Sequence, residues 1–241
     1  YYSPFTGGGR IALAEVGGYD QQDINCYQHQ FSSDATVTPI AACYGGYCGP
    51  TNSATEDTKA TYAGETTLDI DVLAGLDPSA AVDVYEAPYP VQGGSARPNE
   101  FAAIAAAADG GDPVVSISYG WCEARVSAAG EAADEQLLFE RMALQGQSVF
   151  VASGDNGADP CEGNQLGVDS PASDPWATAV GGTSLSNASS PPSETVWNDT
   201  DNPPANSEDP AKNATGGGVS DHWIRPPWQV APGTDNGDHD N

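Results

Sequence analysis

Basic residues are scarce in this sequence. Its 241 residues include 7 Lys and Arg against 34 Asp and Glu, which gives a formal net charge of −27 at pH 7. A chain with so few cations does not bind nucleic acid by neutralising phosphates, and it is not attracted to anionic membranes. We therefore expect no nucleic acid and no membrane among its partners. Carboxylates lose much of their charge as the pH falls toward ~4, so an acidic environment suits this composition.

Long apolar runs are also missing, and none approaches the ~18 residues of a membrane-spanning helix. The sequence has neither an initiator Met nor a signal peptide before Tyr1-Tyr2-Ser3-Pro4, which predicts the processed start of a secreted, extracellular protein. Disorder does not explain the charge, because 39% of the residues are hydrophobic.

The five cysteines show no CxxC pair and no Cys/His ligand spacing, which argues against a structural zinc site. Cys43 and Cys48 are near enough in sequence to close a short loop, and Cys122 with Cys161 is the candidate for a second disulfide. Cys26 is left over, either free or paired outside this chain. Disulfides of this kind fit secretion.

Apolar strands alternate with helices along the chain. Strands are expected at residues 10–16, 82–87, 114–118, 148–152 and 177–180, and helices at residues 64–76, 99–108 and 127–145. Because the strands are apolar throughout, the sequence predicts an α/β fold with a mostly parallel central sheet and helices on both faces. We interpret residues 1–241 as one incomplete domain, with surface segments at 32–62 and 186–213 and a mobile tail at 232–241.

The helix at residues 64–76 carries an acidic pair. Glu65 and Asp69 lie one turn apart, and Val72 and Leu76 continue the same line. Carboxylates on an apolar stripe are costly unless they are paired, protonated or used in function. The structural alternative is an exposed helix with an accidental acidic pair.

Several short segments, in this order and spacing, resemble the sedolisins, which are serine-carboxyl peptidases with a subtilisin-like fold. The segments are Glu15-Val16-Gly17-Gly18-Tyr19, Gly64-Glu65 to Asp69-Ile70, Ser116-Ile117-Ser118-Tyr119-Gly120, Ala152-Ser153-Gly154-Asp155, residues 178–183, Gly216-Gly217-Gly218-Val219-Ser220 and Pro227-Trp228-Gln229. Two of them follow expected strands, at the carboxyl edge where such sheets bind ligands.

The resemblance implies that Glu65 is the general base toward a nucleophilic serine, that Asp69 supports it, and that Asp155 supplies the oxyanion-hole side chain. A glutamate accepts a proton at acid pH, where an imidazole with a pKa near ~6.5 is already charged. Glu65 and Asp69 should titrate as a coupled pair. Asp155 donates a hydrogen bond only while protonated, which sets an upper pH limit.

The resemblance also implies a substrate-binding segment and an outer network. Backbone groups of Ser118, Tyr119 and Gly120 would bind an extended peptide or protein substrate, and Glu15 would contact the acidic pair from behind. Tyr119 stands where the family usually has tryptophan, which changes that outer network.

The family's nucleophile has no counterpart in this sequence. The catalytic serine lies in a Gly-Thr-Ser segment followed by proline, but Gly182-Thr183-Ser184 has Ala188 at the proline position and matches an earlier structural strand. We therefore expect Ser184 to be non-catalytic, the serine to lie beyond Asn241 in a removed segment or a second chain, and the family's calcium site to lie there too.

Three other interpretations compete with this one. An ordinary subtilisin needs a helical histidine, and His29, His222 and His239 all have loop-like sequence surroundings. A glycosidase needs its two carboxylates on opposite sides of a sugar, whereas neighbouring turns of one helix place them on the same side. A non-catalytic relic of the same fold, used for binding, has no reason to keep costly acids.

Overall fold

The computed structural model describes residues 8–50, 56–90, 97–161, 165–186, 193–200 and 213–230, with the backbone alone at 56–61. The chain divides into two compact units. The first unit contains the residues up to Ser118 together with Arg141–Phe150, and the second contains Tyr119–Glu140 and the residues from Val151 onward.

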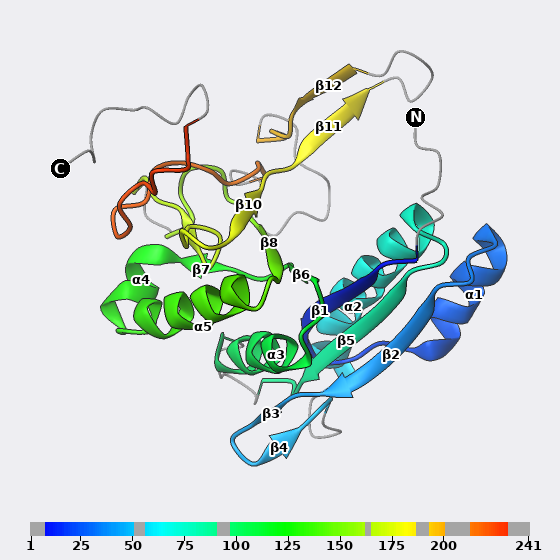
Figure 1. Cartoon of the computed structure of the whole chain (residues 1–241). Helices are drawn as coiled ribbons and strands as arrows, with labels where there is room; N and C mark the ends of the chain where they lie inside the picture. Colours follow the sequence, from blue (N-terminus) through cyan, green and yellow to red (C-terminus); the bar gives the residue numbers. More distant parts are fainter. Residues whose placement is uncertain are drawn as a thin grey trace. The chain divides into compact units, whose positions relative to one another are not determined.

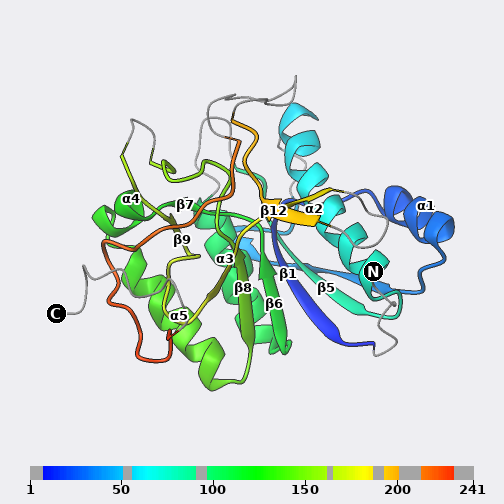
Figure 2. The same ribbon diagram turned by 90° about the horizontal axis from the view of Figure 1, so that it is seen from above.

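A mainly parallel sheet forms the centre of the first unit (Figure 1). Its strands follow the order β8-β6-β1-β5-β2, and β1 pairs in parallel with both β5 and β6. Figure 2 shows β8, β6, β1 and β5 side by side. The strands span Arg10–Val16 (β1), Thr36–Ala41 (β2), Ala81–Ala87 (β5), Val114–Ile117 (β6) and Ser148–Ala152 (β8).

Helices cover both faces of this sheet, as the sequence predicts. They are α1 (Gln21–Phe31), α2 (Glu56–Leu76) and α3 (Arg97–Gly110). Ile24 of α1 and Ile70 of α2 pack with Val84 of β5 in one buried cluster. Tyr85 points to the opposite face, because neighbouring strand residues alternate, and its hydroxyl lies where a Cβ on Gly110 of α3 would be.

A sharp turn after β1 brings its carboxyl end against β5. Gly17 has a φ of +90°, and a side chain there would collide with the ring of Tyr89. Glycine adopts this left-handed conformation without the steric cost of a Cβ. The Gly18 N–H donates to the Tyr89 hydroxyl at 3.2 Å, and the strand therefore ends one residue after Glu15 in a fixed geometry.

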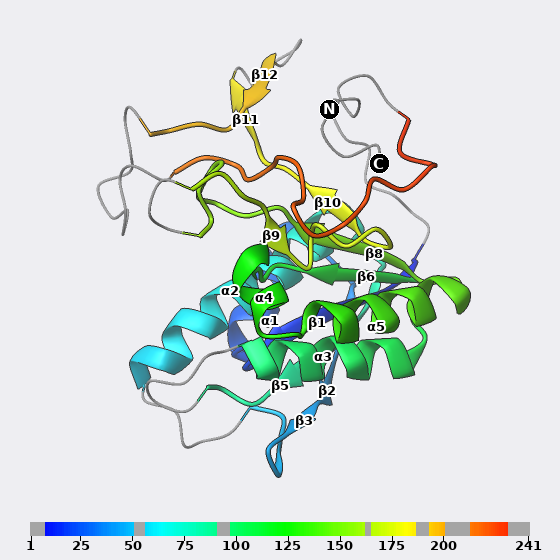
Figure 3. The same cartoon turned by 90° about the vertical axis from the view of Figure 1, so that its left-hand side faces the viewer.

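The second unit combines two helices with short strands. Its elements are β7 (Trp121–Cys122), α4 (Glu123–Ala128), most of α5 (Ala132–Leu144), β9 (Asp169–Ser170), β10 (Thr178–Val180), β11 (Thr183–Ser186) and β12 (Ser193–Val196). β8 continues into this unit, where β10 is its neighbour in the sheet. Figure 3 shows β11 and β12 as an antiparallel pair.

Both expected disulfides are present. Cys43 and Cys48 join the small antiparallel strands β3 (Cys43–Tyr44) and β4 (Tyr47–Cys48), and Cys122 is bonded to Cys161. Cys26 is free and exposed on α1.

Three expectations about secondary structure are wrong. The expected loop at 32–62 contains β2, the β3–β4 pair and the beginning of α2. The expected long helix at 127–145 is two helices, because the chain turns at Gly130 with a φ of +77°. Coverage of the strands on both faces is not general: β1 is buried from Ala12 onward and β5 from Val82 onward, whereas β10 is exposed.

The predicted surface segment at 186–213 contains β12. Residues 187–192 and 201–212 of this segment, and the predicted tail at 232–241, lie outside the described residues. None of the described helices combines the length and hydropathy that crossing a membrane requires.

Candidate active site

The buried face of α2 is one position away from the stripe that the sequence predicts. Thr66, Ile70 and Ala74 are fully buried. Val72 and Leu76, which were expected to form the apolar stripe, are instead 49% and 45% exposed, and Leu68 beside them is 55% exposed. A shift of one residue rotates the buried line by 100°, and this leaves Glu65 and Asp69 half-buried at its border.

Glu15 lies beneath this acidic pair. It is fully buried near the carboxyl end of β1, and the Thr66 hydroxyl donates to its Oε2 at 3.3 Å. Its Oε1 has no hydrogen-bond partner within the described part of the chain. Burial raises the pKa of Glu15 well above its usual value, and the charges of Asp69 and Glu65 and a hydrogen bond with Asp69 raise it further.

Asp69 connects this buried acid to the end of a second strand. The Ser118 hydroxyl, just after β6, donates to Asp69 Oδ2 at 2.6 Å. Burial raises the pKa of Asp69, while the hydrogen bonds from Ser118 and Glu15 act in the opposite direction. Glu15 and Asp69 therefore perturb each other's pKa. The structure thus gathers Glu15, Glu65, Asp69 and Ser118 in the first unit.

The other predicted site residues belong to the second unit. Asp155 is exposed in the turn that follows β8, Tyr119 is half-buried and Gly120 is exposed. Backbone hydrogen bonds hold the turn: the Ala214 N–H donates to Asp155 O at 3.1 Å, and the Gly216 N–H donates to Gly154 O at 2.6 Å.

Similar proteins identify the family. No protein-family model matches the chain. Kumamolisin from Bacillus sp. (strain MN-32) is 36% identical over 229 residues, which are 91% of this chain and 37% of that protein. Sedolisin from Pseudomonas sp. (strain 101) is 39% identical over 130 residues, 50% of this chain and 21% of that protein. A structure of Pseudomonas sedolisin, a serine-carboxyl proteinase complexed with two molecules of pseudo-iodotyrostatin, aligns with a TM-score of 0.75 at 30% identity, over 92% of this chain and 60% of that one.

The chain belongs to the sedolisin family. It spans well under half the length of the curated sedolisins that it matches. The α/β fold with a mostly parallel central sheet is confirmed by the solved sedolisin.

In this sedolisin-family chain, Asp169 lies near Asp155, and no sequence motif indicates it as a site residue. Asp169 is 8% exposed in β9, and a Cβ on Gly154 would collide with its Oδ2. A Cβ on Gly120 would lie 3.4 Å from the Asp169 Cβ. Burial, and then the charge of Asp155, raises the pKa of Asp169 to about 6. The second unit therefore pairs Asp155 with a buried acid.

The structure describes two residues that other catalytic assignments would use, Ser184 and His29. Ser184 pairs with Thr195 between β11 and β12, a structural strand position. His29 is on a helix, not in a loop as expected, but it is an exposed residue in the last turn of α1, while the acidic pair lies on α2.

Metal binding was also expected from the family. Within the described residues, no three His, Cys, Asp or Glu side chains converge on a position that holds a metal ion. Calcium binding therefore stays a prediction from the family resemblance.

The sedolisin-family chain should lose thermal stability between about pH 4 and pH 7. Glu86, the register partner of Glu15 on β5, is 7% exposed, and burial raises its pKa to about 7. A carboxyl whose folded pKa is raised stabilises the fold fully below its unfolded pKa, and this contribution disappears as the pH rises through the folded value. Asp174, with a pKa raised to about 6 mainly by burial, acts in the same direction.

Melting temperatures measured across this range test the prediction. Glu86→Gln should flatten the decline, most clearly near neutral pH, because the amide does not ionise. Asp34→Asn is the matched control in the same unit, because Asp34 is exposed. An unchanged slope in the Glu86→Gln protein would contradict this assignment.

Proposed function

We propose that this chain supplies the general base and the oxyanion side chain of a secreted serine-carboxyl peptidase that hydrolyses peptide bonds at acid pH. The observation that carries the proposal is the Glu15–Asp69–Ser118 network, which borders Glu65 at the carboxyl ends of β1 and β6. Buried, mutually perturbed carboxyls at this edge of a parallel sheet favour catalysis over structure.

Glu65 takes the proton of the attacking serine. It then returns the proton to the leaving amine, as a general base and acid. Asp69 shares the proton and keeps Glu65 oriented. Burial raises the pKa of Glu15 well above its usual value, which favours its neutral form at acid pH, so Asp69 and Glu65 do not face a third negative charge.

Asp155 stabilises the oxyanion that forms when the serine attacks the peptide carbonyl. A protonated carboxyl donates the required hydrogen bond, and a preorganised donor of this kind is a large term in acyl transfer. The two backbone hydrogen bonds to residues 154 and 155 keep the donor in place. Backbone groups of Ser118, Tyr119 and Gly120 bind the extended substrate.

The nucleophilic serine and the calcium ligands come from a further segment, either continuous with this chain or carried by an associated second chain. The second candidate function is a catalytically inactive relic that binds ligands with the same fold. It is favoured only by the absence of a catalytic serine among these 241 residues.

A peptide-aldehyde inhibitor tests the proposal on the complete gene product at acid pH. We expect inhibition of peptide cleavage and a reversible hemiacetal on a serine outside residues 1–241, located in a crystal structure of the inhibited protein. Peptide binding without turnover and without an adduct would favour the relic, and turnover of an oligosaccharide would favour a glycosidase.

A further inference from the structure

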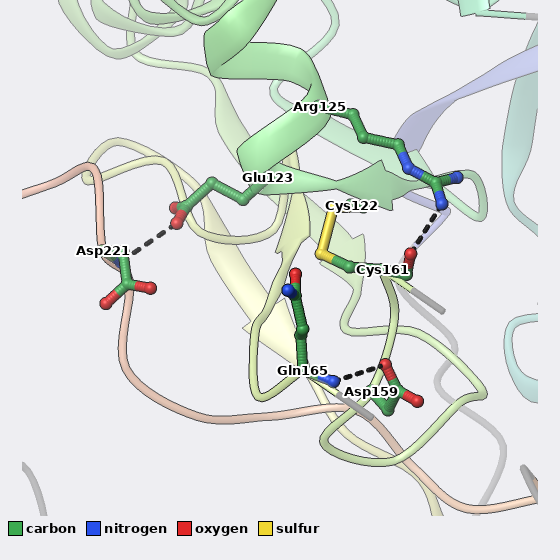
Figure 4. Close-up of a disulfide and its surroundings, with 7 residues drawn as sticks. All are labelled: Cys122, Glu123, Arg125, Asp159, Cys161, Gln165 and Asp221. Atoms are coloured by element: carbon green, nitrogen blue, oxygen red, sulfur yellow. Dashed lines mark hydrogen bonds between the residues drawn. A yellow bond between two sulfur atoms is a disulfide. The ribbon is translucent and has the colours of Figure 1, made fainter. Parts of the chain in front are cut away.

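Glu123 is a buried carboxylate that the proposed mechanism does not use. It is 4% exposed at the beginning of α4, and both of its oxygens bind one distant segment. Figure 4 shows the bond to Asp221. Oε1 accepts a hydrogen bond from the Ser220 hydroxyl at 2.6 Å, and Oε2 accepts one from the Asp221 N–H at 3.1 Å.

The same position is tied to the loop that follows Asp155. The Glu123 N–H donates to Val168 O at 3.0 Å, and the preceding Cys122 is bonded to Cys161. Arg125 adds a hydrogen bond from its Nη2 to Cys161 O at 2.6 Å (Figure 4). Glu123 therefore stands where the end of this loop and the segment around Ser220 are joined.

The segment that Glu123 holds leads directly to Asp155. The Ser220 hydroxyl accepts hydrogen bonds from His222 N–H and Trp223 N–H, which closes a turn. Earlier in the segment, the Ala214 N–H donates to Asp155 O, and the Ser153 hydroxyl donates to Gly216 O at 2.9 Å.

The backbone of this segment is in close contact with the backbone of the Asp155 turn. A Cβ on Gly216 would collide with the carbonyl oxygen of Ser153, so the two backbones are as close as glycine allows. A displacement of the segment is therefore transmitted to the peptide units of Gly154 and Asp155.

We propose that Glu123 is a positioning residue that fixes the segment 214–223 and, through it, the peptide unit of Asp155. This inference rests on the proposed function, in which Asp155 donates to the oxyanion. A donor is effective only in its transition-state position, so loosening the segment affects the chemical step more than substrate binding.

Two substitutions in the complete gene product test the role. In Glu123→Gln, an NH₂ group that cannot accept replaces one carboxylate oxygen, and in Ser220→Ala the donor to Oε1 is removed. Each variant should lower kcat by about 10- to 100-fold, because small misplacements of catalytic groups have effects of this size. KM should stay within about twofold, since the loss is confined to the transition state.

Glu135→Gln is the matched control. Glu135 is also a glutamate with 4% exposure in the second unit, and its Oε2 accepts a hydrogen bond from the Ser170 hydroxyl at 2.6 Å. It should lower the melting temperature as much as Glu123→Gln does, yet leave kcat nearly unchanged. Equal effects of both variants on kcat would show that Glu123 only stabilises the fold.

Hydrogen exchange gives a readout that does not depend on activity. The amides of Ala214 and Gly216 should exchange at least about tenfold faster in Ser220→Ala, because their bonds to the Asp155 turn open more often. Unchanged exchange would overturn the inference. Failure of the proposed function would give a different result. Glu65→Gln would then retain turnover, independently of the effect of Glu123→Gln on kcat.

Discussion

Replacing Glu65 by glutamine in the complete gene product should lower kcat for peptide cleavage at about pH 4 by roughly 10²- to 10⁴-fold, the usual contribution of a general base. The amide keeps the shape and the helix but cannot accept the serine proton. KM should change little, because the proton moves only in the transition state. Steady-state kinetics with a peptide substrate measure both constants.

Asp71→Asn is the control for this experiment. Asp71 is a half-buried carboxyl on the same helix, and its pKa is raised by burial and by the charge of Asp23 on α1, outside the Glu15–Asp69 network. This variant should retain the parent kcat. Undiminished turnover by Glu65→Gln would contradict the proposed role, and an equal loss in both variants would point to a general effect on α2.

The strands that the sequence predicts correctly are the apolar ones. β1, β5, β6 and β8 all lie close to their expected bounds, because burial selects continuous apolar runs. Among the strands that were missed, β2 reads TVTPIA and lies at the edge of the sheet, where one side needs no partner and proline is tolerated. The break at Gly130 was missed because the helical pattern continues on both sides of it.

Residue spacing alone predicted the site only where its contacts are local in sequence, and Glu15, Ser118 and Asp155 were indicated only by the family resemblance. The one-turn spacing of Glu65 and Asp69 identified the pair, but it did not determine which face of α2 is buried. Ser118 lies 49 residues after Asp69, and no motif connects the two side chains. Glu123 and Ser220, 97 residues apart, meet through tertiary packing that a single sequence does not encode locally.

Asp155→Ala should lower kcat by about 10²- to 10³-fold, because the variant removes one oxyanion donor and nothing replaces it. Asp155→Asn keeps a hydrogen-bond donor at this position but removes its dependence on pH. The amide donates at every pH, so this variant should keep more activity than alanine and extend the active range toward neutral pH, provided Glu65 performs the base step. Asp155 is exposed, and both variants should fold.

The measurement is kcat as a function of pH for the parent and both variants. Equal losses in the alanine and asparagine variants, with an unshifted upper limit, would mean that the Asp155 carboxyl does not act as a hydrogen-bond donor.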